Sequence, residues 1–202
     1  DLFSPTALTK SITLRGAGVN TDTIAGTHPT IITGSTNSTS GCFYVFASNC
    51  TIEGIKFSGR VYVGYRHSGS TTNTINPRFY KCNIYGIYAY AGYNGSKMTN
   101  GQFVNCKISR FDCQNTYNTQ IINSVVGSFS NTGEDYFVDV VNSIIKSGSL
   151  SAISAMNSII CGTTSNSSTP GYSCTFINCI GIKPGSYNPF GSGFTENCAT
   201  RS

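Results

Sequence analysis

The chain of 202 residues is long enough for one domain or one elongated body of repeats. Only 10% of its residues are charged and its net charge is +5, without a Lys/Arg-rich run, so we do not expect nucleic-acid binding. Hydrophobic residues make up 39%, which is enough to drive folding, yet no apolar run is long enough to cross a membrane.

Strand-forming residues (Tyr, Phe, Ile, Val and Thr) dominate the chain, and Gly, Asn and Ser interrupt them every few residues. No long stretch shows the period of a helix, so the predicted class is all-β. An antiparallel sandwich would need hairpin turns between its strands. Few such sites occur, among them Asn94–Gly95 and Pro170–Gly171, which favours parallel strands.

One short phrase returns along the chain, in which apolar residues flank an Asn followed by Cys or Ser. A weak first copy lies at Leu8–Leu14, and Lys replaces Asn in one later copy. The copies are Asn49–Cys50, Lys81–Cys82, Asn105–Cys106, Asn123–Ser124, Asn142–Ser143, Asn157–Ser158, Asn178–Cys179 and Asn197–Cys198. Their spacing varies from 15 to 32 residues, as in a solenoid whose turns differ in length while its strands stack.

Each copy predicts a strand, a sharp corner and a second strand. Asn tolerates the left-handed backbone of such a corner. The Cys or Ser that follows then points inward, the next residue outward, and the following Ile or Val inward. Neighbouring turns lie ~4.8 Å apart, so that Asn stacks on Asn in a hydrogen-bonded ladder.

The nine cysteines are an odd number, and most of them belong to the repeat rather than to a disulfide framework. A position that also accepts Ser does not require a disulfide, so we expect reduced, buried thiols there. These cysteines are Cys50, Cys82, Cys106, Cys179 and Cys198. Cys161 and Cys174 bracket a loop, and a disulfide between them is left open. No CxxC motif or His/Cys cluster indicates a metal site.

The segment Ser11–Gly26, SITLRGAGVNTDTIAG, together with the Asn-Cys-x-Ile phrases, resembles the pectin-lyase-like superfamily. This resemblance implies a single-stranded right-handed parallel β-helix over residues 1–202, of about eight turns. The chain opens at Asp1 within a strand-like pattern, which suggests a fragment of a longer or processed chain. The same architecture carries lyases, hydrolases, esterases, tailspikes and adhesins, so the resemblance leaves the activity open.

The longest interval between copies, from Cys50 to Cys82, and the stretch after it are rich in tyrosine and arginine. In RVYVGY and YGIYAY we expect the tyrosines to gather on one face of a strand, as alternation places Tyr88 and Tyr90. A row of exposed tyrosines beside cations suits a sugar chain, above all an anionic one. Ordinary surface tyrosines, or tyrosines packed against a loop, are an equal alternative. The ligand-binding candidates are Tyr62, Tyr65, Tyr80, Tyr85, Tyr88, Tyr90, Arg60 and Arg66.

Catalytic signals are weak. Glycoside hydrolysis needs two facing carboxylates, for which Asp135 and Asp139 are the candidates, although a polar loop is the simpler interpretation. A polysaccharide lyase needs a base and a cation beside a uronate, for which the candidates are Arg66, His67, Arg78 and Lys81. The Asp-Asp and His-Gly signatures of polygalacturonases on this fold are absent, as is the Arg-x-Pro-x-x-Arg stretch of pectate lyases.

We therefore expect an extracellular or cell-surface module that binds a polysaccharide or surface glycan without catalysis, in the manner of an adhesin. The alternative is a lyase or hydrolase acting on an acidic polysaccharide. No cofactor is expected, apart from Ca²⁺ if the protein is a lyase. The oligomeric state is left open.

Overall fold

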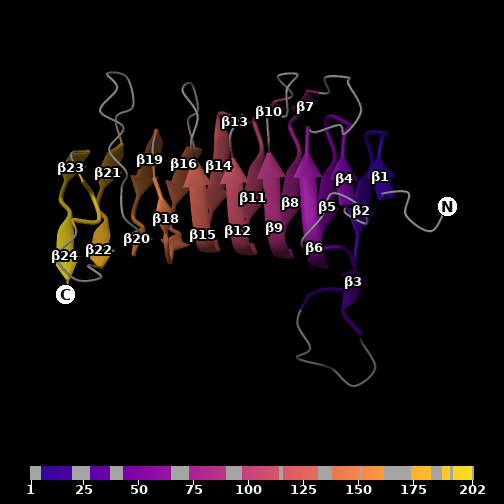
Figure 1. Cartoon of the computed structure of the whole chain (residues 1–202), viewed down its shortest axis with the longest axis horizontal. Coiled ribbons are helices and arrows are strands. Elements are labelled where there is room, and N and C mark those ends of the chain that lie inside the picture. Colours follow the sequence, from indigo (N-terminus) through magenta and orange to yellow (C-terminus); the bar gives the residue numbers. More distant parts are fainter. Residues whose placement is uncertain are drawn as a thin grey trace.

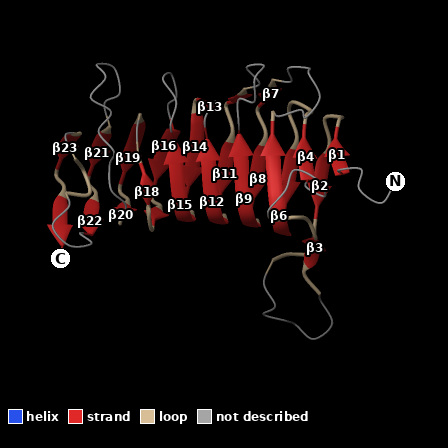
Figure 2. Cartoon of the chain, in the orientation of Figure 1, coloured by secondary structure: helices blue, strands red, loops and turns tan. Residues whose placement is uncertain are grey.

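The computed structural model describes residues 6–19, 28–36, 43–64, 73–89, 97–113, 116–131, 138–150, 152–161, 174–182, 188–191 and 193–201. These ranges contain strands and no α-helix, as Figure 2 shows, so the all-β prediction is confirmed for them. None of them therefore contains a helix long and apolar enough to span a membrane.

The strands form three sheets, which we name A, B and C. Sheet A has twelve strands: β1 (Thr6–Leu8), β3 (Thr30–Ile32), β4 (Phe43–Val45), β6 (Ile55–Val63), β9 (Asn83–Ala89), β12 (Lys107–Cys113), β15 (Val125–Asn131), β17 (Ile144–Ile145), β18 (Gly148–Ser149), β20 (Ile159–Ile160), β22 (Ile180–Ile182) and β24 (Ala199–Arg201). Sheet B has nine: β2 (Thr13–Arg15), β5 (Thr51–Glu53), β8 (Arg78–Tyr80), β11 (Gln102–Val104), β14 (Thr119–Ile122), β16 (Val138–Val141), β19 (Ile153–Met156), β21 (Thr175–Ile177) and β23 (Phe194–Glu196). Sheet C has three: β7 (Thr74–Ile75), β10 (Met98–Thr99) and β13 (Thr116–Tyr117).

From β5 onward the chain passes from a strand of sheet B to one of sheet A and then returns to the next strand of sheet B, by way of sheet C at β7, β10 and β13. We call each such pair of strands a rung. Every pairing among the described strands is parallel, for example β11 with β14 and β12 with β15. The rungs follow one another along the long axis from β1 to β24 (Figure 1). This order excludes an antiparallel sandwich for the described strands and is compatible with a parallel β-helix.

Two columns of left-handed residues make the corners of the stack. The first corner precedes sheet B and contains Asn49, Asn76, Asn100 and Asn118, with φ from 48° to 57°. The second corner joins sheet B to sheet A. It contains Gly54, Lys81, Asn105, Asn123, Asn142, Asn157, Asn178 and Asn197, with φ from 49° to 67°. Asn occupies most positions because it tolerates this conformation better than other residues with a side chain.

For the earliest copies of the repeat phrase, the predicted corner is the wrong one. Because Thr51 pairs with Arg78, Asn49 aligns with Asn76 and not with Lys81. Gly54, with a φ of 67°, takes the second-corner position in that rung. Cys50 therefore does not share its position with the cysteines that follow the second corner, although it is fully buried. The weak copy at Leu8–Leu14 aligns with the same first corner, since Thr13 pairs with Thr51.

The residue after the second corner points into the stack from β9 onward, as predicted. In this column every described Cys or Ser up to Cys179 is at most 3% exposed: Cys82, Cys106, Ser124, Ser143, Ser158 and Cys179. Each Ser hydroxyl donates to the carbonyl two residues before it and accepts an N–H from the preceding rung, as Ser143 does with Val141 and Ser124. The column therefore satisfies buried polar groups.

The cysteines whose side chains the structure describes are free thiols, including Cys161 and Cys174. Cys42 and the side chain of Cys113 lie outside the described part of the chain.

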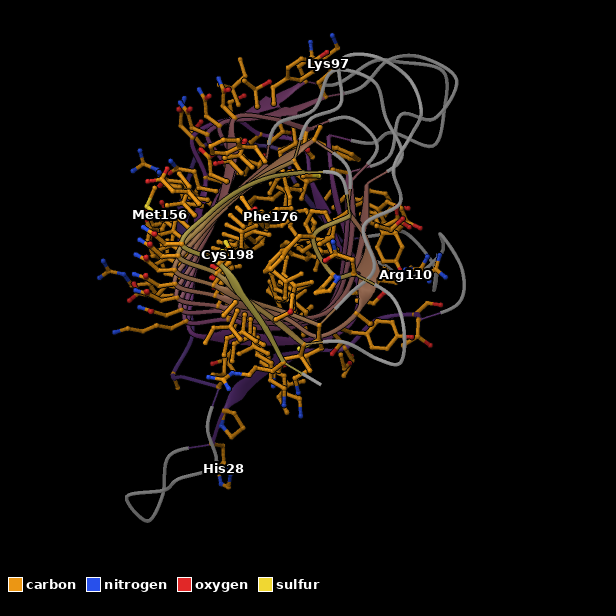
Figure 3. The ribbon with its side chains drawn as sticks, turned by 90° about the vertical axis from the view of Figure 1, so that its left-hand side faces the viewer. His28, Lys97, Arg110, Met156, Phe176 and Cys198 are labelled. Carbon is orange, nitrogen blue, oxygen red and sulfur yellow. The ribbon has the colours of Figure 1, made fainter. Side chains whose placement is uncertain are left out.

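The core lies between the sheets and is aromatic in its middle rungs. Phe79 stacks on Phe103 at 5.0 Å between ring centroids, and Phe111 stacks on Phe129 at 5.5 Å. Phe103 and Phe111 meet edge to face at 5.0 Å, which joins the two pairs across the interior. All four rings are fully buried. In the view along the stack in Figure 3, Phe176 likewise points inward, while Met156 and Arg110 point outward on opposite sides.

Candidate functional site: a tyrosine column and a basic groove

A column of three tyrosines lies on the outer face of sheet A. Tyr44, Tyr62 and Tyr88 are paired in register on β4, β6 and β9. Their ring centroids are 5.2 Å and 5.3 Å apart along the column. Phe46 packs against the same cluster, which is separate from the main core. The column thus runs across adjacent parallel strands and includes Tyr44, whereas the sequence suggested successive tyrosines along one strand.

Two arginines enclose the ring of Tyr88. The guanidinium carbons of Arg60 and Arg110 lie 4.9 Å and 5.6 Å from its centroid. Both arginines pair with Gly86, which leaves space for the ring between them. A Cβ at Gly86 would lie 2.7 Å from a ring carbon of Tyr88. Cation–π attraction and the missing side chain together hold the ring in this place.

Asp112 extends the same column by one rung, because it pairs with Tyr88. Its Oδ2 accepts a hydrogen bond from Arg110 at 3.1 Å, and only 12% of its side chain is exposed. Its Oδ1 is buried and has no hydrogen-bond partner among the described residues. The carboxylate therefore depends on Arg110 for compensation of its charge.

The expectation of an exposed row of tyrosines is wrong for Tyr62 and Tyr88, which are 5% and 7% exposed. Their rings contact one another and the arginines, so they do not present an open platform. Tyr85 is exposed at 39%, and Tyr80 is half-buried with its hydroxyl 3.3 Å from Gln102 Oε1. Among the other ligand-binding candidates, Tyr65, Arg66 and Tyr90 lie outside the described residues.

Burial raises the pKa of Tyr88 above its ordinary value of 10.0, against a smaller opposing effect of Arg110 and Arg60. The folded chain therefore keeps this proton at pH values where the unfolded chain releases it. The stability held by the neutral hydroxyl is complete below pH 10 and is lost as the pH rises through the folded pKa. We expect urea unfolding between pH 8 and pH 11 to show a shallower alkaline loss of stability in Tyr88→Phe. An equal loss in both proteins would contradict this.

An open groove lies at the second corner, near the N-terminal end of the stack. Its volume is about 880 Å³. One wall is the segment Arg15–Val19, and the floor runs along the corner through Gly54, Lys81, Asn105 and Asn123. The wall is held in place by backbone bonds from Gly16 N to Glu53 O (2.8 Å) and from Gly18 N to Gly54 O (3.0 Å).

The groove is basic and rich in amides. Lys81 and Lys107 line it, are exposed, and form no ion pair with the described residues. Arg15 forms an ion pair with Glu53 at 3.1 Å, in which the Arg15 side chain is 75% exposed. Apart from Glu53, the described lining residues carry no acidic group; Asn83, Asn105 and Asn123 supply amides. This combination suits carboxylate and hydroxyl groups of a ligand.

The remaining catalytic candidates are not brought together. Lys81 lies in the groove, whereas Arg78 and Asp139 lie in an outward row of sheet B. The row continues from Arg78 through Gln102 and Gln120 to Asp139, which separates the two by three rungs, or ~14 Å. Arg66, His67 and Asp135 lie outside the described residues. The described part of the chain contains no group of three His, Cys, Asp or Glu residues that could hold a metal ion.

Most of the groove was missed by reasoning from sequence. Arg15, Glu53 and Lys107 were not candidates, because each lies in or beside an ordinary strand. The repeat contained a usable signal. Lys107 lies two residues after the corner residue Asn105, just as Asn83 lies two residues after the corner residue Lys81. Comparison with protein-family models, with curated proteins and with solved structures found no match.

Proposed function

We propose that the chain is a right-handed parallel β-helix of the pectin-lyase-like type that binds an acidic polysaccharide or surface glycan outside the cell, without catalysis. The basic groove at the second corner carries this proposal. Lys81, Lys107 and Arg15 face an open volume of about 880 Å³ together with three asparagine amides. An acidic sugar chain offers the carboxylates and hydroxyls that such groups bind.

The groove replaces the tyrosine column as the proposed contact surface. Tyr62 and Tyr88 are buried, whereas Lys81 and Lys107 are exposed. Because neither lysine forms an ion pair with the described residues, no such pair has to break before they bind a carboxylate. Binding at exposed lysines is electrostatic and should weaken as salt is added.

We expect the double variant Lys81→Gln/Lys107→Gln to bind uronate polymers at least tenfold more weakly than the unchanged chain. Isothermal titration calorimetry with polygalacturonate and alginate fragments measures this, at low and at physiological salt. The matched control is Lys10→Gln/Lys146→Gln, which lowers the net charge equally at exposed positions outside the groove lining. Equal weakening in both variants, or none in either, would contradict a site in the groove.

The same samples should be assayed for new unsaturated sugar ends. Their appearance would replace the non-catalytic proposal with the lyase, for which Lys81 is the candidate base in the groove. Their absence alongside tight binding is the expected result.

A further inference from the structure

The second corner continues beyond the groove as a regular exposed strip. Its centre is a row of four exposed asparagines, and an aliphatic residue precedes each of them on sheet B and another follows on sheet A. The asparagines are Asn123, Asn142, Asn157 and Asn178. The residues on the sheet B side are Ile122, Val141, Met156 and Ile177, and those on the sheet A side are Val125, Ile144, Ile159 and Ile180. We call these twelve residues the corner strip. It carries no charge.

The row is periodic because each asparagine is bonded to the next rung. Asn123 N donates to Val141 O and Asn142 N to Met156 O, each at 3.0 Å. Asn157 N donates to Ile177 O at 3.0 Å in the same way. Successive asparagines are thus one rung, or ~4.8 Å, apart. A sugar ring in an extended chain advances by a similar distance.

Two amides of this row, and that of Asn105 in the groove, have no partner within the described protein. At the first corner, Asn76 Nδ2 donates to Asn49 Oδ1 (2.8 Å) and Asn100 Nδ2 to Asn76 Oδ1 (3.1 Å), which forms a ladder of three asparagines. At the second corner, the side chains of Asn105, Asn123 and Asn142 form no hydrogen bond with the described residues, and only Asn178 bonds to Asn157 (3.2 Å). The exposed amides of the second corner are therefore available to a ligand.

The two aliphatic rows complete a surface that matches one face of a sugar chain. Met156 and Ile180 are 40% and 43% exposed, and the other aliphatic residues of the corner strip are half-buried. The C–H face of a pyranose ring packs on such side chains, while its hydroxyls bond to the amides between them. Because the corner strip starts at Asn123, which also lines the groove, the two surfaces are continuous.

We infer that one acidic glycan chain lies parallel to the stack axis, with carboxylates in the groove and further sugars along the corner strip, about one sugar per rung. This inference rests on the proposed function and adds the direction and length of the site. From Lys81 to Asn178 the site would span five rung intervals, or ~24 Å.

Length dependence tests the inference. We expect calorimetry with purified oligouronates of three to eight sugars to show affinity rising at least tenfold between the trimer and the hexamer, and then levelling off. The variant Asn142→Asp/Asn157→Asp places negative charge in the corner strip, and Asp also tolerates the left-handed backbone. It should weaken hexamer binding at least tenfold and leave trimer binding unchanged. The control Asn100→Asp/Asn118→Asp makes the same charge change at the first corner, and circular dichroism confirms that each variant is folded.

The outcomes separate the two proposals. If the trimer binds through Lys81 and Lys107 but affinity does not rise with the length of the oligouronate, binding in the groove is supported and binding along the corner strip is contradicted. If hexamer binding resists both aspartates in the corner strip, the inference fails in the same way. If no oligouronate binds at any length, the proposed function fails and the inference fails with it.

Discussion

Phe103→Ala is expected to lower the free energy of unfolding by about 3–5 kcal/mol, the cost of emptying a buried aromatic site. Phe103 is fully buried and contacts two rings, Phe79 at 5.0 Å and Phe111 at 5.0 Å between centroids. Its edge-to-face contact with Phe111 joins the two stacked pairs across the interior. Its removal therefore leaves a cavity between rungs that the hydrogen-bonded strands hold apart.

Equilibrium unfolding in guanidinium chloride measures this loss. Phe194→Ala is the control, because the Phe194 side chain lies on β23 and is 62% exposed. A surface substitution of that kind should cost less than ~0.5 kcal/mol. A loss below ~1 kcal/mol for Phe103→Ala would show that the aromatic stack is not a close-packed core.

Ser143→Ala is expected to cost about 1–3 kcal/mol, because it leaves a buried donor without its acceptor. Ser143 Oγ accepts the N–H of Ser124 at 3.0 Å and donates to the carbonyl of Val141 at 2.8 Å. The hydroxyl is thus the link between one rung and the next inside the corner. Alanine fills nearly the same volume as serine, so the loss of stability measures the contribution of the hydrogen bonds and not that of a cavity.

The chain itself supplies the control. Cys106 and Cys179 occupy the same position on other rungs, and their thiols also contact the carbonyl two residues before, at 3.4 Å and 3.3 Å. Cys198 Sγ accepts the N–H of Cys179 at 3.4 Å, as a serine would. Ser143→Cys should therefore keep most of the stability that Ser143→Ala loses. Equal losses in both variants would show that the buried bonds contribute little.

Much of the arrangement could be predicted because one physical requirement recurs. A left-handed corner followed by a small inward residue selects Asn and then Cys or Ser, and the sequence repeats that choice. The prediction failed at Asn49–Cys50 because the first corner has the same requirement, so the same two residues fit either place. Only the pairing of Thr51 with Arg78 distinguishes them. Local sequence identifies a corner, but register comes from the neighbouring strand.

The candidate site was harder to predict, because the exposure of a side chain depends on what covers its strand and not on the alternation of residues within that strand. RVYVGY places Tyr62 correctly on the outer face, yet its neighbours Tyr44 and Tyr88 bury it. The groove depends on Arg15 and Lys81, which are far apart in sequence and meet only because their rungs lie close in the stack. Residue type alone does not predict that two such residues lie close together.

Each described rung pairs with its immediate neighbours, and this arrangement affects how the chain folds. The contacts of each strand lie within about one repeat of the chain, so the sequence separation of contacting residues does not grow as rungs are added. Folding is expected to nucleate in the middle, where Phe79, Phe103, Phe111 and Phe129 interlock, and to propagate towards both ends. The outer rungs, such as the one with the exposed strands β23 and β24, should exchange their amide hydrogens first.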